Sequence, residues 1–132
     1  MEVVVDTSIV IAVVLNEETR SNLLEVTGEM GLLAPSSLHW EVGNALTSLF
    51  RRRRLTFEDG MKALGEYAGI PLRFEDVTLE RALEVAHQHE IHAYDAYLIA
   101  CAQDWELPLL TLDATQASVA RRLGVEVMEV SS

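Results

Sequence analysis

Four acidic residues of this chain lie in sequence contexts where acids are unusual: Asp6, Glu41, Asp95 and Asp113. Two of them follow short apolar runs, and the other two border or interrupt apolar helical patterns. An ionised carboxylate beside a protein core needs a partner, because its desolvation is very costly. Basic partners are absent nearby in the sequence, and Lys62 is the single lysine. A hard divalent cation is therefore the simplest partner, and cations held by several carboxylates suit phosphoryl chemistry.

The elements that would position these acids alternate between strands and helices. Short runs rich in Val and Leu predict strands near residues 3–5, 32–34, 72–74, 109–112 and 125–128. Longer periodic patterns predict helices near residues 8–15, 19–29, 37–53, 57–68, 77–89, 93–104 and 114–123. This alternation predicts an α/β fold with a mostly parallel central sheet of four to five strands and helices on both faces.

Two of the acids are expected at one edge of this sheet. Asp6 follows the run at 3–5, and Asp113 follows the run at 109–112, each directly before a predicted helix. Ligands of parallel sheets collect at the carboxyl ends of the strands. Asp6 and Asp113 should therefore share that edge.

The other two acids belong to predicted helices. At about 100° of rotation per residue, Glu41 projects onto the flank of the apolar stripe of helix 37–53, one turn from Asn44. In helix 93–104 the same rotation places Asp95 among inward-facing residues such as Leu98. We therefore expect Asp95 to point at the core.

Each acid also has a purely structural interpretation. Asp6 could cap the helix that follows it, and Asp113 with Gln116 imitates a capping box. Asp95 could stabilise the dipole of a first helical turn, and Glu41 could reach water from a boundary position. These interpretations explain the acids one at a time but not their expected convergence. Four carboxylates that meet would raise each other's pKa values in the absence of metal.

The composition is that of a single folded domain. The 132 residues are 49% hydrophobic and 23% charged, which is typical of globular proteins rather than of disordered chains. No apolar run reaches the roughly 18 residues of a membrane span, and the N-terminus has no signal-peptide pattern. The single Cys101 cannot form an internal disulfide. We therefore expect a cytoplasmic protein in a reducing compartment, without a membrane partner.

The net charge restricts the partners. A formal charge of −11 repels polyanions at long range, so general nucleic-acid coating is not expected, including general DNA binding by this chain alone. The charge does not exclude an enzyme that binds one phosphate through metal ions. It also favours a basic protein partner.

Four segments together resemble the PIN domains, and among them the small VapC-type ribonuclease toxins of toxin–antitoxin pairs. The segments are VVVDTS at 3–8, WEVGNAL at 40–46, YDAYLIA at 94–100 and LTLD at 110–113. Each motif alone is weak, but their order and spacing fit across essentially the whole chain. Residues 1–132 are therefore expected to form one PIN domain.

The resemblance implies a Mg²⁺- or Mn²⁺-dependent endoribonuclease that hydrolyses RNA phosphodiester bonds. The implied ligands of one or two ions are the four acids: Asp6, Glu41, Asp95 and Asp113. Four polar residues would orient these acids or the substrate, although caps and surface polar groups explain them equally well: Thr7, Ser8, Asn44 and Thr111. The implied partners are an RNA substrate, a cognate antitoxin that covers the site, and a second copy of the chain in a homodimer.

The sequence departs from the family pattern at two positions. His92 stands where the family often has a small polar residue, which puts the start of the helix at 93 in question. No further acid follows Asp113 within residues 114–117. A site of four acids is what we expect.

Other motifs have open interpretations. The only dense basic cluster, residues 51–54, is either a solvated helix end or a contact for RNA phosphates. The histidines within 87–92 suggest zinc only weakly, because a well-spaced fourth ligand is missing. Trp40 and Trp105 suit packing or an interface better than base stacking.

Two other functions share parts of the acid pattern. A phospho-accepting receiver domain also has an acid pocket, but it needs a lysine at a strand end, and Lys62 lies in a predicted helix. A PIN-like scaffold that binds a partner without cleavage is the main alternative to a nuclease. Intact acids at all four positions favour the nuclease.

Overall fold

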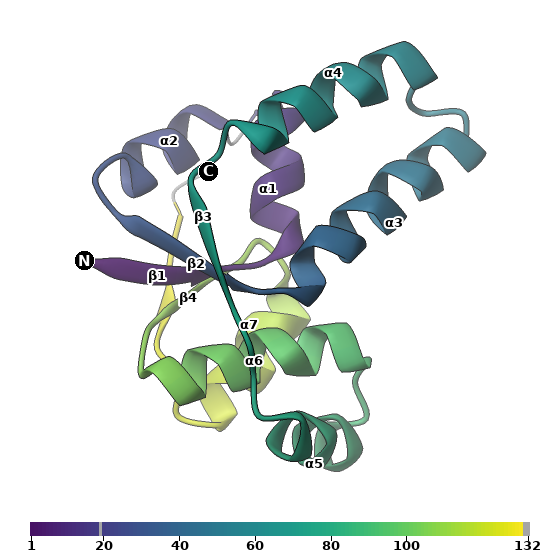
Figure 1. Ribbon diagram of the computed structural model, residues 1–132. Helices are drawn as coiled ribbons and strands as arrows, with labels where there is room; N and C mark the ends of the chain where they lie inside the picture. The colour runs from purple at the N-terminus through teal and green to yellow at the C-terminus, as the bar shows by residue number, and fades with distance from the viewer. Residues whose placement is uncertain (19, 131–132) are drawn as a thin grey trace.

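The computed structural model describes residues 1–18 and 20–130, which form one five-stranded sheet with helices on both sides (Figure 1). The elements are β1 (Glu2–Val5), α1 (Thr7–Val14), α2 (Arg20–Thr27), β2 (Gly31–Pro35), α3 (Ser37–Arg51), α4 (Phe57–Ala68), β3 (Leu72–Glu75), α5 (Leu79–His89), α6 (Ala93–Trp105), β4 (Leu109–Leu110), α7 (Ala114–Arg122) and β5 (Val127–Met128). The predicted α/β alternation is confirmed. Of the helix expected near 19–29, position 19 lies outside the described residues.

β1 is the central strand of the sheet, although it comes first in the sequence. The order is β3-β2-β1-β4-β5, and every pairing is parallel. Val4 of β1 pairs with Leu33 of β2 on one side and with Leu109 of β4 on the other. A central strand between two helical layers is buried on both faces, which explains why residues 3–5 are all valine.

β4 and β5 are shorter than the sequence predicts, with two residues each. β4 ends where Thr111 turns its hydroxyl toward Asp6. Before β5, the backbone N–H of Val125 donates to the carbonyl of Ala120, so Val125 completes the end of α7 instead of extending the strand.

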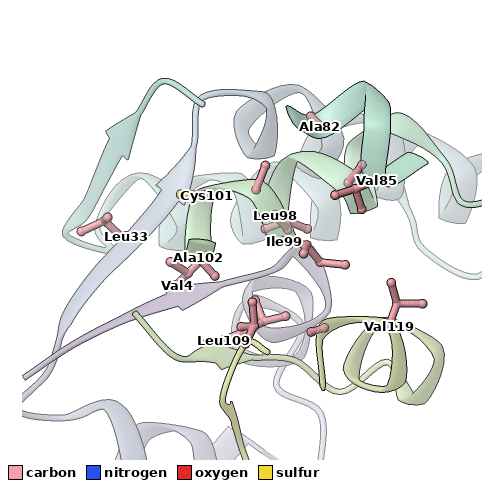
Figure 2. Packing of buried hydrophobic residues seen from close by; sticks show 14 residues of the cluster. Val4, Leu33, Ala82, Val85, Leu98, Ile99, Cys101, Ala102, Leu109 and Val119 are labelled. Carbon is pink, nitrogen blue, oxygen red and sulfur yellow. The ribbon is translucent and has the colours of Figure 1, made fainter. Parts of the chain in front are cut away.

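Alternate strand residues build separate cores on the two faces of the sheet. Val4, Leu33 and Leu109 point to the face covered by α5, α6 and α7, where they pack with Leu98 and Ile99 of α6 (Figure 2). The neighbouring strand residues point to the opposite face, which α1 to α4 cover. The sheet is thereby held rigidly between two layers, as the site at its edge requires.

α3 and α4 form a hairpin that extends past the sheet on the side where β1 and β2 end (Figure 1). Near the sheet, side chains of both helices pack with α1 in one apolar cluster. At the free end, Phe50 lies directly against Gly60, so that a Cβ at position 60 would stand 2.3 Å from the Phe50 ring.

Cys101 is a core residue of α6. Burial raises the pKa of its thiol to about 12, so the thiol stays protonated at neutral pH. Separately, none of the helices in the described ranges has the length and apolar character needed to cross a lipid bilayer.

Candidate active site

The four acids lie on elements that meet at the carboxyl edge of the sheet. Asp6 follows β1 directly, and Asp113 comes shortly after β4. Glu41 lies in the second turn of α3, which follows β2, and Asp95 lies in the first turn of α6. The parallel arrangement of β1, β2 and β4 is what brings segments so distant in sequence to one edge.

Asp6 is the most deeply buried of the four acids, with 5% of its surface exposed. It is the N-cap of α1, and its Oδ1 accepts hydrogen bonds from the backbone N–H of Ile9 at 3.3 Å and from the hydroxyl of Ser8 at 2.5 Å. Its Oδ2 accepts a hydrogen bond from the hydroxyl of Thr111. The predicted cap is confirmed, but capping uses only one of the two oxygens.

Ser8 and Thr111 fasten the ends of β1 and β4 to each other. While donating to Asp6, the Ser8 hydroxyl accepts from the backbone N–H of Leu112 at 2.9 Å. The Thr111 hydroxyl likewise donates to Asp6 and accepts from the N–H of Asp113 at 3.0 Å. A hydroxyl that both donates and accepts has a fixed orientation. The two loops thereby set the position of Asp6 relative to Asp113.

Glu41 is half-buried on α3 and is held by a residue of α1. The hydroxyl of Thr7 donates to Oε2 of Glu41 at 2.7 Å. Because Thr7 follows Asp6 directly, this bond ties the acid of α3 to the acid that follows β1. Asn44 is exposed one turn further along α3, and in the described chain it forms no hydrogen bond to any of the four acids.

Asp95 is half-buried in the first turn of α6, so the expectation that it points into the core is wrong. Leu98 and Ile99, one turn later, take the core positions. Ala96, the next residue, is fully buried in the core, while Asp95 lies close enough to Glu41 and Asp113 to interact with both carboxylates. α6 begins at Ala93 as expected, with His92 as its N-cap.

Asp113 caps α7, and its neighbour Gln116 has a role that the sequence did not predict. Oδ1 of Asp113 accepts from the backbone N–H of Gln116 at 3.0 Å, which is one half of the expected capping box. The Gln116 side chain is buried, and its Nε2 donates to the carbonyl of Asp95 at 3.1 Å instead of returning to Asp113. Gln116 thus links the first turns of α6 and α7. The one signal in the sequence was a polar residue on the core-facing side of α7.

The four acids interact as a ring of like charges. Electrostatic repulsion links Asp6 with Asp113, Asp113 with Asp95, Asp95 with Glu41, and Glu41 with Asp6. Burial is the main cause that raises the pKa values of Asp6, Glu41 and Asp95, and this repulsion adds to it. Hydroxyl donors at Asp6 and Glu41, and the charge of His92 near Asp95, act in the opposite direction.

No lysine or arginine forms an ion pair with these four acids within residues 1–18 and 20–130, and His92 near Asp95 offsets the repulsion only in part. The ion pairs found there use other acids: Glu2, Glu58, Glu75, Asp104 and Glu129. A set of carboxylate oxygens without a lysine or arginine partner is the donor chemistry that hard divalent cations prefer. In the same ranges, no three His, Cys, Asp or Glu side chains already form a complete metal site.

The fold and these carboxylates define a class of protein, a parallel α/β domain with an acidic site at the strand ends. The PIN domain family model matches residues 3–122. The chain therefore belongs to the PIN domain family, and the resemblance seen in its motifs is confirmed. A search of curated proteins found none that matches it.

Several solved structures share this fold. The chain is similar to PAE2754 from Pyrobaculum aerophilum, with 22% identity over 90% of this chain and 87% of that one and a TM-score of 0.68. It is similar to VapBC2 from Rickettsia felis bound to a promoter DNA fragment, with 14% identity over 99% and 100% of the chains and a TM-score of 0.71. It is also similar to Mycobacterium tuberculosis VapC20, a Sarcin-Ricin loop cleaving toxin, with 15% identity over 88% and 93% and a TM-score of 0.62. At these identities the likeness concerns the fold.

Proposed function

We propose that this chain is a metal-dependent endoribonuclease in which Asp6, Glu41, Asp95 and Asp113 hold one or two Mg²⁺ or Mn²⁺ ions. The observation that carries the proposal is the ring of four carboxylates at the sheet edge, which has hydroxyl donors but, among the described residues, no lysine or arginine partner. Divalent ions would offset the repulsion and supply Lewis-acid chemistry for phosphodiester hydrolysis. Membership of the PIN domain family supports the same activity.

The acids of the site differ in how firmly hydrogen bonds hold them. Asp6 has both oxygens occupied by donors, so it is the fixed member of the ring. Glu41 has one donor, Thr7, and can adjust more. Asp113 is exposed, so we propose that RNA approaches from its side. Thr7, Ser8 and Thr111 are then orienting groups for the acids rather than contacts for the substrate.

We also propose that the chain, residues 1–132, is one PIN domain that acts in the cytoplasm as the toxin of a toxin–antitoxin pair. Two of the similar structures, from Rickettsia felis and Mycobacterium tuberculosis, are described as a VapBC complex and a VapC toxin, which supports this proposal. The formal charge of −11 suits a basic antitoxin segment, whose side chain could take the place of a cation among the acids. A homodimer completes the expected assembly.

The test of the nuclease is the cleavage of defined RNAs with and without Mn²⁺. Wild-type protein should cleave in Mn²⁺ and not in EDTA. Asp6→Asn should lose at least about a hundredfold in rate, since one acid of the ring is removed while a good N-cap is kept. Glu84→Gln, which removes an exposed acid of α5 with the same change in charge, should cleave as wild type does.

Three outcomes would contradict the proposal in different ways. Cleavage that persists in EDTA, or full activity in Asp6→Asn, would reject the metal-dependent mechanism. RNA binding without cleavage in every divalent metal would favour a non-catalytic scaffold. For the partner, a cognate antitoxin that binds Asp6→Ala and Asp95→Ala as tightly as wild type would reject the insertion of a basic side chain among the acids.

A further inference from the structure

The free end of the α3–α4 hairpin carries four consecutive exposed arginines, Arg51 to Arg54. None of the ion pairs among the described residues includes them, whereas four of the other six basic residues are paired with carboxylates: Lys62, Arg73, Arg81 and Arg121. In a chain of net charge −11, the densest positive charge thus has no carboxylate partner among the described residues.

The end of α3 does not require this charge. A cation stabilises the helix dipole only within the last turn, and the Nε of Arg52 already donates to the carbonyl of Ser48 there at 3.4 Å. Arg53 follows the C-cap with a left-handed φ of 57°, where glycine is the residue that local structure favours. Glu90 and Glu106 take the same conformation after α5 and α6, so the position itself does not select a cation.

The position of the arginines relative to the acids suggests what they bind. Arg51 comes ten residues after Glu41 on the same helix, a separation of about 15 Å along its axis. This exceeds the screening length of about 8 Å at physiological salt, so the arginines do not neutralise the acids. The hairpin extends past the ends of β1 and β2 (Figure 1), and Asp6 follows the end of β1 directly. A ligand that contacts the arginines and also reaches the acid ring must be anionic and extended.

We propose that Arg51–Arg54 bind backbone phosphates of the RNA strand whose scissile bond lies at the acid ring. This inference rests on the proposed nuclease function and names a substrate contact for it. The remaining surface repels a polyanion, so a local cluster of guanidinium groups supplies the attraction that brings the strand in. Phosphate contacts position a strand without reading its sequence, so the cluster sets affinity rather than the cleavage sequence.

RNA affinity is best measured in an Asp6→Asn background with Mn²⁺ present, so that binding is observed without cleavage. Arg53→Gln with Arg54→Gln should weaken binding about tenfold, and should lower the slope of log Kd against log salt by about 0.7 for each lost phosphate contact. In the active protein, the same pair of changes should raise KM and leave kcat nearly unchanged.

A matched control exists on two helices outside the hairpin. Arg81→Gln with Arg122→Gln makes the same change in charge at exposed arginines. Arg81 pairs with Asp104 near the end of α6, whereas Asp95 lies in the first turn of that helix, and Arg122 is the last residue of α7, which Asp113 caps at its start. This control should retain the RNA affinity and the salt slope of the parent protein.

Arg53→Gly separates binding from folding. Glycine adopts the left-handed conformation of position 53 without strain. The unfolding temperature of the Arg53→Gly variant should therefore equal or exceed that of wild type, while its RNA binding weakens. Equal loss of affinity in the Arg81 and Arg122 control would show a general charge effect and overturn the inference. Unchanged affinity in the Arg53 and Arg54 variant would also overturn it, and would assign the cluster to another ligand such as an acidic protein segment. Failure of wild type to cleave, with arginine-dependent binding retained, would reject the nuclease alone.

Discussion

At the scale of single residues, Asp6 combines a structural role and a proposed chemical role on different oxygens. Oδ1 caps α1 by accepting from the N–H of Ile9, while Oδ2 accepts from the hydroxyl of Thr111, which directly follows β4. Asparagine is as good an N-cap as aspartate. Asp6→Asn therefore removes the charge and keeps the cap, which allows the fold and the chemistry to be examined separately.

The buried carboxyl of Asp6 should make the stability of the protein depend on pH. Burial raises the pKa of Asp6 in the folded protein above its value in the unfolded chain. The protonated form therefore stabilises the fold below the unfolded pKa of about 3.9, and this contribution is lost as pH rises through the folded pKa. Without metal, the unfolding temperature of wild type should fall as the pH rises above about 4. Asp6→Asn should show a shallower fall, measured by circular dichroism in EDTA.

The control for this prediction is Glu84→Gln, which removes one negative charge from the surface of α5. It should keep the pH slope of wild type, because general repulsion by the net charge changes little. An identical slope in Asp6→Asn and wild type would mean that the buried carboxyl does not drive the pH dependence.

The hydrogen bond of the Gln116 side chain should contribute to stability and to cleavage. Gln116→Met preserves the volume of a buried side chain but removes the bond from Nε2 to the carbonyl of Asp95. We expect a loss of about 1 kcal/mol in the free energy of unfolding, measured with urea. The cleavage rate should also fall, since the bond joins the turns that carry Asp95 and Asp113. Gln88→Met, at an exposed position of α5, should change neither quantity.

Which acids meet could be predicted from the sequence, but how each is held could not. Asp6 and Asp113 were placed correctly at one edge, because strand ends of a parallel sheet coincide whatever the side-chain packing. The half-exposure of Asp95 and the bond from Gln116 to its carbonyl depend on how α6 and α7 pack against each other. Helical periodicity within one segment does not encode this tertiary packing.

At the scale of elements, the free end of the α3–α4 hairpin has a close contact between the Phe50 ring of α3 and Gly60 of α4. A Cβ at Gly60 would stand 2.3 Å and 2.4 Å from atoms of the Phe50 ring, whereas nothing lies within 4 Å of a Cβ at Gly65 of the same helix. Gly65→Ala should stabilise the protein by about 1 kcal/mol through helix propensity. Gly60→Ala should instead destabilise it by about 1–3 kcal/mol, because the ring must shift.

Denaturant unfolding of these two variants measures the difference directly. Comparable stabilisation by both alanines would show that Phe50 moves aside freely and that the hairpin is loosely packed at its end. Cleavage by Gly65→Ala should equal that of wild type, since its exposed position lies away from the acids.

The sequence predicted the helices and strands of the described chain, but it overestimated the lengths of β4 and β5. The seven predicted helices correspond to α1–α7 of the described chain, since each has a run of apolar residues with helical period. β4 and β5 have two residues each, too few to show a period, and their ends are decided by contacts of Thr111 and Val125 with distant residues.

At the scale of the whole molecule, occupation of the acid ring should change global stability. A ligand that binds only the folded state at a hundredfold excess over its Kd adds about 2.7 kcal/mol. Mn²⁺ should therefore raise the unfolding temperature of wild type and raise that of Asp6→Asn or Asp95→Asn much less. Equal increases in all three proteins would place the bound ions elsewhere on the acidic surface.

The central place of the first strand has a consequence for synthesis of the protein. The bond from Thr111 to Asp6 joins residues separated by 105 positions, and β1 lacks one neighbour until β4 has been translated. Contacts of such long range form late, because the loop between them must close first. A growing chain therefore carries Asp6, Glu41 and Asp95 before Thr111 and Asp113 have been made. For the proposed nuclease, this order delays activity until the segment with Thr111 and Asp113 has been translated and β4 has paired with β1.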